Sequence, residues 1–171
     1  RNSGRGVAYW SPGESGDGAR IFVVTPGYHL IALDAFNGRP ISEFGEDGVL
    51  DLMIGVRGGI SPVGRIGSSS PPVIVGDVVI VGSAQEVGMA PDSIRNIKGD
   101  VRGFDVRTGE LMWTFHTIPA SGEFGYDTWE DGSAEYSGNA GVWAPFSADL
   151  ELGYVYLPVE DATSDYYGGH R

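Results

Sequence analysis

The chain has 171 residues, a formal net charge of −12 at pH 7, 41% hydrophobic residues, 28 glycines and no cysteine. The negative charge argues against a nucleic-acid-binding surface, because phosphate binding needs clustered Lys and Arg, and the lack of cysteine excludes disulfide and thiolate–metal chemistry within these residues. Almost no stretch has helical periodicity, so we expect an all-β fold with an acidic, solvated surface.

The first elements are two apolar runs, 21–24 and 29–33, which predict a pair of strands. An Asp-x-x-x-Gly motif follows at 34–38. Its Asp and Asn favour a turn through side-chain to backbone hydrogen bonds, while its Gly supplies positive φ. An aromatic residue, Phe44, closes the motif. This pattern indicates a hairpin turn between the outer strands of a β-propeller blade.

The segment 71–82, Pro-Pro-Val-Ile-Val-Gly-Asp-Val-Val-Ile-Val-Gly, has two short β-branched runs around a Gly-Asp turn, and it predicts a hairpin. The turn motif returns in 103–113, where we expect Asp105 to shape the turn and Trp113 to pack as the closing aromatic. The two copies lie farther apart than the roughly 40 to 50 residues of ordinary propeller repeats, which predicts large insertions between blades.

A third hairpin is predicted from the runs 142–149 and 153–157, with Trp143 in the core. Three partial blades are therefore expected in one domain, 1–171, without an internal boundary. A closed propeller needs at least about four blades of four strands, so we expect the chain to be a piece of a longer protein. Neither a signal peptide nor a transmembrane segment is recognisable.

Several segments together resemble the pyrroloquinoline quinone (PQQ) dehydrogenases. The resemblance covers nearly the whole chain in the right order, and its Trp-Ala-Pro and Tyr-Leu-Pro elements look most like the branch that contains membrane-bound glucose dehydrogenase. The segments that carry it are Arg-Gly-Val-Ala-Tyr-Trp at 5–10, the hairpin at 71–82, the turn at 103–113, Gly-Asn-Ala-Gly-Val-Trp-Ala-Pro at 138–145 and Tyr-Tyr-Gly-Gly-His-Arg at 166–171.

This resemblance implies an eight-bladed propeller, of which the chain would supply about three blades, with PQQ and Ca²⁺ near the axis. Such enzymes oxidise alcohols, polyols or aldoses by hydride transfer to PQQ, and they pass electrons to a quinone or a cytochrome. It also implies a periplasmic location, or the periplasmic face of the inner membrane, with any membrane association made by parts outside this chain. The carboxylate base is expected beyond Arg171, so no catalytic residue is assigned.

The resemblance also implies four cofactor contacts. Arg5 matches an arginine whose planar guanidinium suits a carboxylate. Trp129 falls where the family places a tryptophan that stacks on the cofactor, and Ser69 and Ser83 correspond to hydroxyl contacts. The structural alternatives are a surface arginine, loop packing of the indole and turn capping by the serines.

For the metal, the resemblance implies Glu86 and Asn139 as ligands. Calcium takes about six to eight oxygen ligands from carboxylates, amides and other oxygen groups. Glu86 follows the predicted hairpin that ends near Ser83, and Asn139 lies in the glycine-rich approach to Trp143. The alternative for Asn139 is a turn in a glycine-rich loop.

Two further functions remain open at this point. One is a non-catalytic propeller scaffold that binds protein partners in the cell envelope, and the other is a family member that has lost its cofactor. Arg5, Glu86 and Trp129 separate the enzyme from the scaffold, because a scaffold needs no cation, acid and stacking face that converge on an axis. Within the enzyme hypothesis the substrate is a sugar or an alcohol, with glucose favoured over methanol and ethanol.

Overall fold

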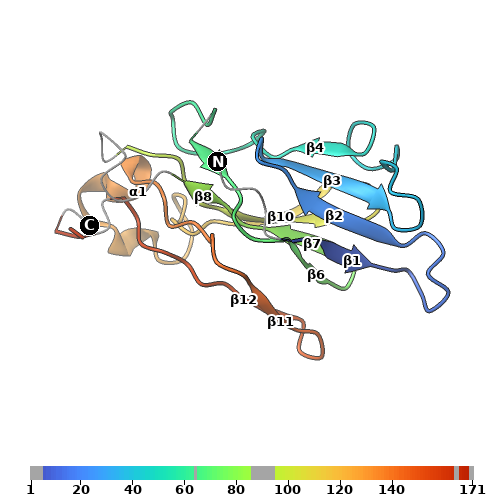
Figure 1. Ribbon diagram of the computed structural model, residues 1–171. Coiled ribbons are helices and arrows are strands. Elements are labelled where there is room, and N and C mark those ends of the chain that lie inside the picture. The colour runs from blue at the N-terminus through green and yellow to red at the C-terminus, as the bar shows by residue number, and fades with distance from the viewer. Residues whose placement is uncertain (1–5, 64, 86–94, 164–165, 170–171) are drawn as a thin grey trace.

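The structure is a computed structural model that describes residues 6–63, 65–85, 95–163 and 166–169. Two four-stranded antiparallel sheets and a two-stranded hairpin make up most of it, which confirms the predicted all-β, propeller-type architecture (Figure 1). Helical structure in the described residues is limited to the single turn α1 (Ser133–Tyr136) and the 3-10 turns η1 (Tyr126–Thr128) and η2 (Glu130–Gly132).

The first sheet has its four strands in chain order. Alternate residues point into the core, as expected for strands with one buried face: Phe22 and Val24 on the second strand, and Leu30 and Ala32 on the third, are almost fully buried. The predicted strand pair is confirmed. The strands are β1 (Ala8–Trp10), β2 (Arg20–Val24), β3 (His29–Asp34) and β4 (Val49–Asp51).

The second sheet contains the hairpin predicted at 71–82. Val75 pairs with Val78 across the Gly-Asp turn, and the sheet is completed by the two strands on either side of the second turn motif. Along the sheet the strand order is β10-β9-β7-β6. The bounds are β6 (Val73–Val75), β7 (Val78–Val81), β9 (Val101–Asp105) and β10 (Leu111–Phe115).

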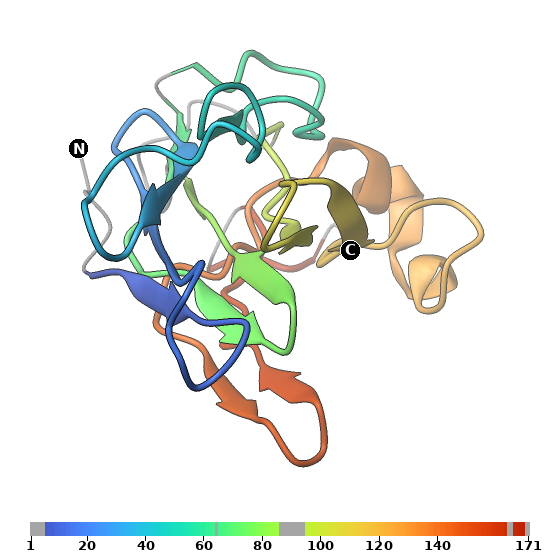
Figure 2. The same cartoon turned by 90° about the vertical axis from the view of Figure 1, so that its right-hand side faces the viewer.

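The third hairpin, β11 (Ser147–Asp149) and β12 (Tyr154–Tyr156), projects from the two sheets (Figure 2). Of the predicted run 142–149 only 147–149 forms a strand; residues 142–146 do not, and Pro145 has no N–H for a strand ladder. The prediction that Trp143 is a core residue is wrong, because the residue is 48% exposed. Its main-chain carbonyl oxygen instead accepts a hydrogen bond from the Ser69 hydroxyl. A small pairing joins β5 (Ile66–Gly67) to β8 (Ala84–Gln85).

Both copies of the Asp-x-x-x-Gly motif form the predicted turn, and they use equivalent hydrogen bonds. The Asp34 carboxylate accepts the N–H groups of the residues two and three positions later, and Asp105 does the same with distances of 2.7 and 2.8 Å. In each copy the glycine N–H donates to the carbonyl oxygen of the aspartate, and Gly38 and Gly109 have φ of 72° and 78°.

The aromatic residue that closes each motif has a separate docking site. Phe44 is fully buried, with its ring 5.5 Å from that of Phe22, and it lies beside Gly109 in the turn of the second sheet. The indole of Trp113 lies over Gly103 on the neighbouring strand, where any side chain would overlap it. Both aromatic residues therefore pack as structural parts of blades.

Arg102 on β9 ties the two large sheets together. Its guanidinium donates hydrogen bonds to the carbonyl oxygens of Leu52 and Ile54, which follow β4, and it lies 5.9 Å from the ring centre of Tyr28. The Tyr28 hydroxyl donates to the carbonyl oxygen of Gly82 at 3.2 Å, and burial raises the pKa of that hydroxyl. Polar groups thus join the sheets inside the core.

A single stretch of chain, residues 138–143, crosses the end of the second sheet; we call it the crossing segment. Its backbone lies so close to that of Gly99 that a side chain there would overlap Gly141. The Gly99 N–H donates to the carbonyl oxygen of Asn139 at 2.7 Å, and Asn139 also pairs with Lys98 in a parallel bridge. Glycine is needed at position 99 because only its lack of Cβ allows this approach.

We predict that Gly99→Ala lowers the free energy of unfolding by about 1–3 kcal/mol, the usual cost of overpacking, because the new methyl group has no space beside Gly141. Equilibrium urea unfolding measures this change. The control is Gly67→Ala, since a side chain at Gly67 would meet nothing within 4 Å. Equal stability of the two variants would contradict the close approach.

A second prediction concerns the pH dependence of the turn at Asp105. Burial acts to raise the pKa of this carboxyl, but hydrogen bonds from Thr108 and Arg107 outweigh it and lower the pKa below the ordinary value. A depressed folded-state pKa stabilises the fold above the unfolded-state pKa of about 3.9, and this stabilisation is lost as the pH falls through the folded-state value. The stability difference between the wild type and Asp105→Asn should therefore shrink below about pH 4 in unfolding titrations; a constant difference would contradict it.

Candidate functional site

Two residues predicted to form the site, Ser69 and Ser83, lie against the crossing segment. Ser69, which is 6% exposed, donates its hydroxyl proton to the carbonyl oxygen of Trp143 at 2.7 Å. Ser70 donates to the same oxygen. These two hydrogen bonds fix the C-terminal end of the crossing segment. Because the Ser69 hydroxyl proton is used in this way, only the lone pairs of the Ser69 oxygen remain for another hydrogen bond.

Ser83 lies against the middle of the crossing segment. It is 1% exposed, and its hydroxyl oxygen accepts a hydrogen bond from Nε2 of Gln85 at 2.7 Å. That bond orients the Gln85 amide so that Oε1 is buried beside Gly141 without a hydrogen-bond partner within the described part of the chain. A side chain at Gly141 would overlap this oxygen, so the glycine lets the amide approach the backbone.

Asn139 is the most constrained of the predicted site residues. Its backbone has φ of 59°, a left-handed conformation that asparagine tolerates better than most residues. Its N–H donates to the carbonyl oxygen of Ile97 at 2.6 Å, and its side chain is 1% exposed. Among the described residues, neither Oδ1 nor Nδ2 of its amide has a hydrogen-bond partner. Because buried polar groups are nearly always partnered, this amide fits a site for a bound group.

Trp129 lies between η1 and η2 and is half-buried. Together with Tyr126 it packs against a small cluster of buried residues that includes Ala140 of the crossing segment. The Tyr126 hydroxyl donates to Glu135 on α1 at 2.8 Å, which holds the loop against the helix. The indole therefore packs against the same cluster as Ala140 of the crossing segment, although it comes from a separate loop.

Lys98 is a residue of this region that the sequence reasoning did not assign. It is 7% exposed, and its ammonium donates to the carbonyl oxygens of Ala134 at 2.5 Å and Ser137 at 2.7 Å. Burial lowers the pKa of Lys98 to about 8. One sequence signal was available, because the single lysine of the chain stands in the alternating polar run Asn-Ile-Lys-Gly-Asp at 96–100.

Asp100, two residues after Lys98, forms an ion pair at the same end of the second sheet. Its carboxylate accepts two hydrogen bonds from Arg57, each 2.6 Å long, and Arg57 also donates to the carbonyl oxygen of Ile118 at 2.8 Å. This bidentate pair is of the geometrically specific kind. It fixes the loop before Trp129 to the start of β9.

Two of the six predicted site residues, Arg5 and Glu86, lie outside the described residues. The ranges that the structure describes contain no group of three or more His, Asp or Glu side chains suited to a metal ion. They also contain no helix with the length and apolar character needed to cross a membrane.

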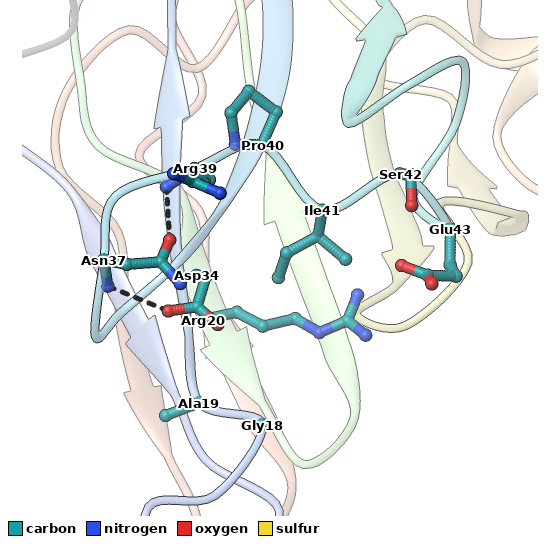
Figure 3. Close-up of a pocket in the computed structure, with 10 residues that line it drawn as sticks. All are labelled: Gly18, Ala19, Arg20, Asp34, Asn37, Arg39, Pro40, Ile41, Ser42 and Glu43. Atoms are coloured by element: carbon teal, nitrogen blue, oxygen red, sulfur yellow. Dashed lines mark hydrogen bonds between the residues drawn. The ribbon is translucent and has the colours of Figure 1, made fainter.

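A depression of about 300 Å³ lies elsewhere, at the turn after β3, and no predicted site residue lines it (Figure 3). Two of its polar side chains make hydrogen bonds that belong to the fold. Arg20 donates to the carbonyl oxygens of Val106 and Arg107, and Asp34 caps its own turn. This depression is therefore a feature of the blade junction rather than the predicted site.

The donors gathered at the crossing segment are chemically suited to PQQ and a calcium ion. PQQ carries three carboxylates and an ortho-quinone, and calcium prefers oxygen ligands. The buried amides of Asn139 and Gln85 offer carbonyl oxygens without described partners, and Trp129 offers an aromatic surface nearby. The described residues therefore fit a cofactor of this chemistry, because their buried amide atoms have no hydrogen-bond partner among the described residues.

Comparison with known proteins identifies relatives across most of the chain. It is 29% identical over 163 residues to the "Quinoprotein glucose dehydrogenase A" of Acinetobacter calcoaceticus, covering 89% of this chain and 18% of the relative. It is 31% identical over 175 residues to the "Glycerol dehydrogenase large subunit" of Gluconobacter oxydans, covering 98% and 22%. The chain therefore spans about a fifth of the length of these relatives.

The fold has a solved counterpart in the quinohemoprotein alcohol dehydrogenase from Comamonas testosteroni. The TM-score is 0.66 at 23% sequence identity, with 94% of this chain and 22% of the other covered. At this identity the likeness bears on the fold alone.

Family membership follows from a match over the whole chain. The family model described as "PQQ: Glucose/ethanol/alcohol dehydrogenase, beta-propeller domain" matches residues 1–171. The match agrees with the blade-like sheets and the two docked turn motifs. The chain belongs to the PQQ glucose/ethanol/alcohol dehydrogenase β-propeller family.

Proposed function

We propose that this chain is part of a PQQ- and Ca²⁺-dependent dehydrogenase that oxidises a sugar, a polyol or another alcohol. The observation that carries the proposal is that the Ser69 hydroxyl, the main chain of Ser83 and the small cluster against which Trp129 packs all meet at residues 138–143, the segment of backbone that carries Asn139. These residues come from four separate parts of the sequence. A scaffold that only binds protein partners has no need of buried amides and an indole gathered in this way.

Four residues are proposed to contact the cofactor. The Arg5 guanidinium pairs with a carboxylate, and Trp129 provides a flat face for stacking. Ser69 offers hydroxyl lone pairs, because its proton is held by the carbonyl oxygen of Trp143. Ser83 contributes its hydroxyl and orients Gln85.

The metal is proposed to bind the Glu86 carboxylate and the Asn139 amide oxygen. Burial of Asn139 favours this role, because an amide removed from water gains more from a cation than an exposed amide does. Bound at these residues, PQQ would supply a hydride acceptor and Ca²⁺ would supply Lewis-acid polarisation. The chain's own residues hold and orient these groups, and the base that removes the hydroxyl proton is proposed to lie beyond Arg171.

The substrate class is proposed from the relatives and the resemblance together. The printed names of relatives include glucose and glycerol dehydrogenases, and the Trp-Ala-Pro element at 143–145 favours a sugar. Electrons are proposed to pass to a quinone or a cytochrome. The location is proposed to be the periplasm or the periplasmic face of the inner membrane.

The stacking role is tested with Trp129→Ala in the full-length protein. Loss of the indole should raise the PQQ dissociation constant about tenfold or more, since stacking alone is worth about 0.5–1.5 kcal/mol beyond the buried area. Fluorescence titration with PQQ measures the affinity, alongside dye-linked oxidation of glucose and ethanol. Phe124→Ala is the control, because Phe124 is in the same loop and is fully exposed.

Unchanged PQQ affinity in Trp129→Ala would contradict stacking by this residue. No PQQ binding by the wild-type protein would contradict the dehydrogenase proposal as a whole. In that case the non-catalytic scaffold becomes the better hypothesis.

The metal role is tested by removal of calcium and by two variants of Asn139. Dialysis against a chelator should abolish oxidation, and added Ca²⁺ should restore it. Asn139→Gly keeps the left-handed backbone without strain but removes the amide, so it should raise the calcium concentration for half-maximal activity at least tenfold, a typical effect even for outer-shell partners. Asn139→Asp keeps an oxygen ligand and should retain calcium-dependent activity, and equal calcium dependence in all three proteins would contradict ligation by Asn139.

A further inference from the structure

At the end of the second sheet, residues 96–100 form a strap that leads into β9. The strap contacts the crossing segment on one side and α1 on the other. Its Ile97 carbonyl oxygen accepts the N–H of Asn139, and its Lys98 pairs with Asn139 in a parallel bridge. The strap therefore lies directly against the proposed metal ligand.

On its other side the strap contacts α1, which lies in sequence between Trp129 and Asn139. Lys98 makes this contact through its side chain, with hydrogen bonds to the carbonyl oxygens of Ala134 and Ser137 of 2.5 and 2.7 Å. These carbonyls lie in and just after the helix, where carbonyl groups lack intrahelical partners. A cation at this end also interacts favourably with the helix dipole, although a single turn has only a small one.

Few side chains other than lysine could make both contacts at position 98. The side chain must reach two carbonyl oxygens from a buried position, and a compact ammonium with three donors does so. A buried charge is costly unless it is paired or hydrogen-bonded. Here the acidic groups of Asp100 and Glu135 are near enough to favour the charged form, while Arg57 opposes it.

We propose that Lys98 is a positioning residue, which clamps α1 to the strap and so sets the distance between Trp129 and the Asn139 amide. This inference rests on the proposed function, because it concerns the stacking face and the metal ligand assigned there. Lys98 acts through the backbone of 134–137, and it is assigned no contact with cofactor or substrate. The clamp joins the loop that carries Trp129 to the crossing segment that carries Asn139.

The first test uses hydrogen exchange of the full-length protein without PQQ. Lys98→Met keeps the length of the side chain but removes its donors and charge. We expect exchange in peptides that cover 133–140 to accelerate about tenfold or more, including the Ser137 N–H, which donates to Ser133. Exchange in β2 should be unchanged.

The second test measures PQQ affinity of the same variant by fluorescence titration at saturating Ca²⁺. We expect the dissociation constant to rise about 10- to 100-fold, the range found when a residue that orients ligands is lost. Val24→Ala is the control for stability, because Val24 is 1% exposed in the core of the first sheet. This variant should lose stability and retain PQQ affinity.

Lys98→Gln serves as the milder variant if Lys98→Met does not fold, since its amide retains donors for one carbonyl oxygen. It should give smaller increases in exchange and in the dissociation constant. Wild-type PQQ affinity in either variant, or unchanged exchange at 133–140, would overturn the role of Lys98. Absence of PQQ binding by the wild type would instead overturn the proposed function, and the cofactor part of this inference with it.

Discussion

The structure depends on one close backbone contact, in which the crossing segment 138–143 lies against Gly99 at the end of the second sheet. Glycine on both sides removes the Cβ atoms that would separate the chains. The resulting hydrogen bond, from the Gly99 N–H to the carbonyl oxygen of Asn139, places an asparagine with left-handed backbone in the interior. Among the described residues, Ser69 and Ser83 of the candidate site lie against the same crossing segment.

A consequence of the contact is an unusually polar interior at one end of the sheets. Lys98, Asp100 and Asn139 are almost fully buried there, and the first two are hydrogen-bonded to groups of the protein. Buried networks of this kind specify geometry when all members are satisfied. The Asn139 amide is not satisfied in this way, because neither its oxygen nor its nitrogen has a hydrogen-bond partner among the described residues, and an unsatisfied amide in an ordered network is a physical reason to expect a ligand.

The blades and the site follow different rules. Blade strands need alternating apolar residues and a short turn, and the turn at 105–109 is built by hydrogen bonds within five residues, so local sequence predicts it well. The site instead joins Ser69, Ser83, Trp129 and Asn139, which are distant in the chain. The resemblance to a family named these residues, but no local rule predicts that Ser69 binds the Trp143 carbonyl oxygen, and Arg5 and Glu86 remain predictions.

The sequence by itself determined the strand pair at 21–24 and 29–33, the hairpin at 71–82 and both turn motifs, because each depends on side-chain periodicity and on residues a few positions apart. It did not determine that Trp143 is half exposed or that Lys98 is buried, since burial depends on which segments pack together. Only the tertiary structure decided that the run 96–100 meets 138–143. The physical reason is that this contact is made by the backbones of glycines. Their lack of side chains permits a close approach, but nothing in the local sequence indicates which segment will approach.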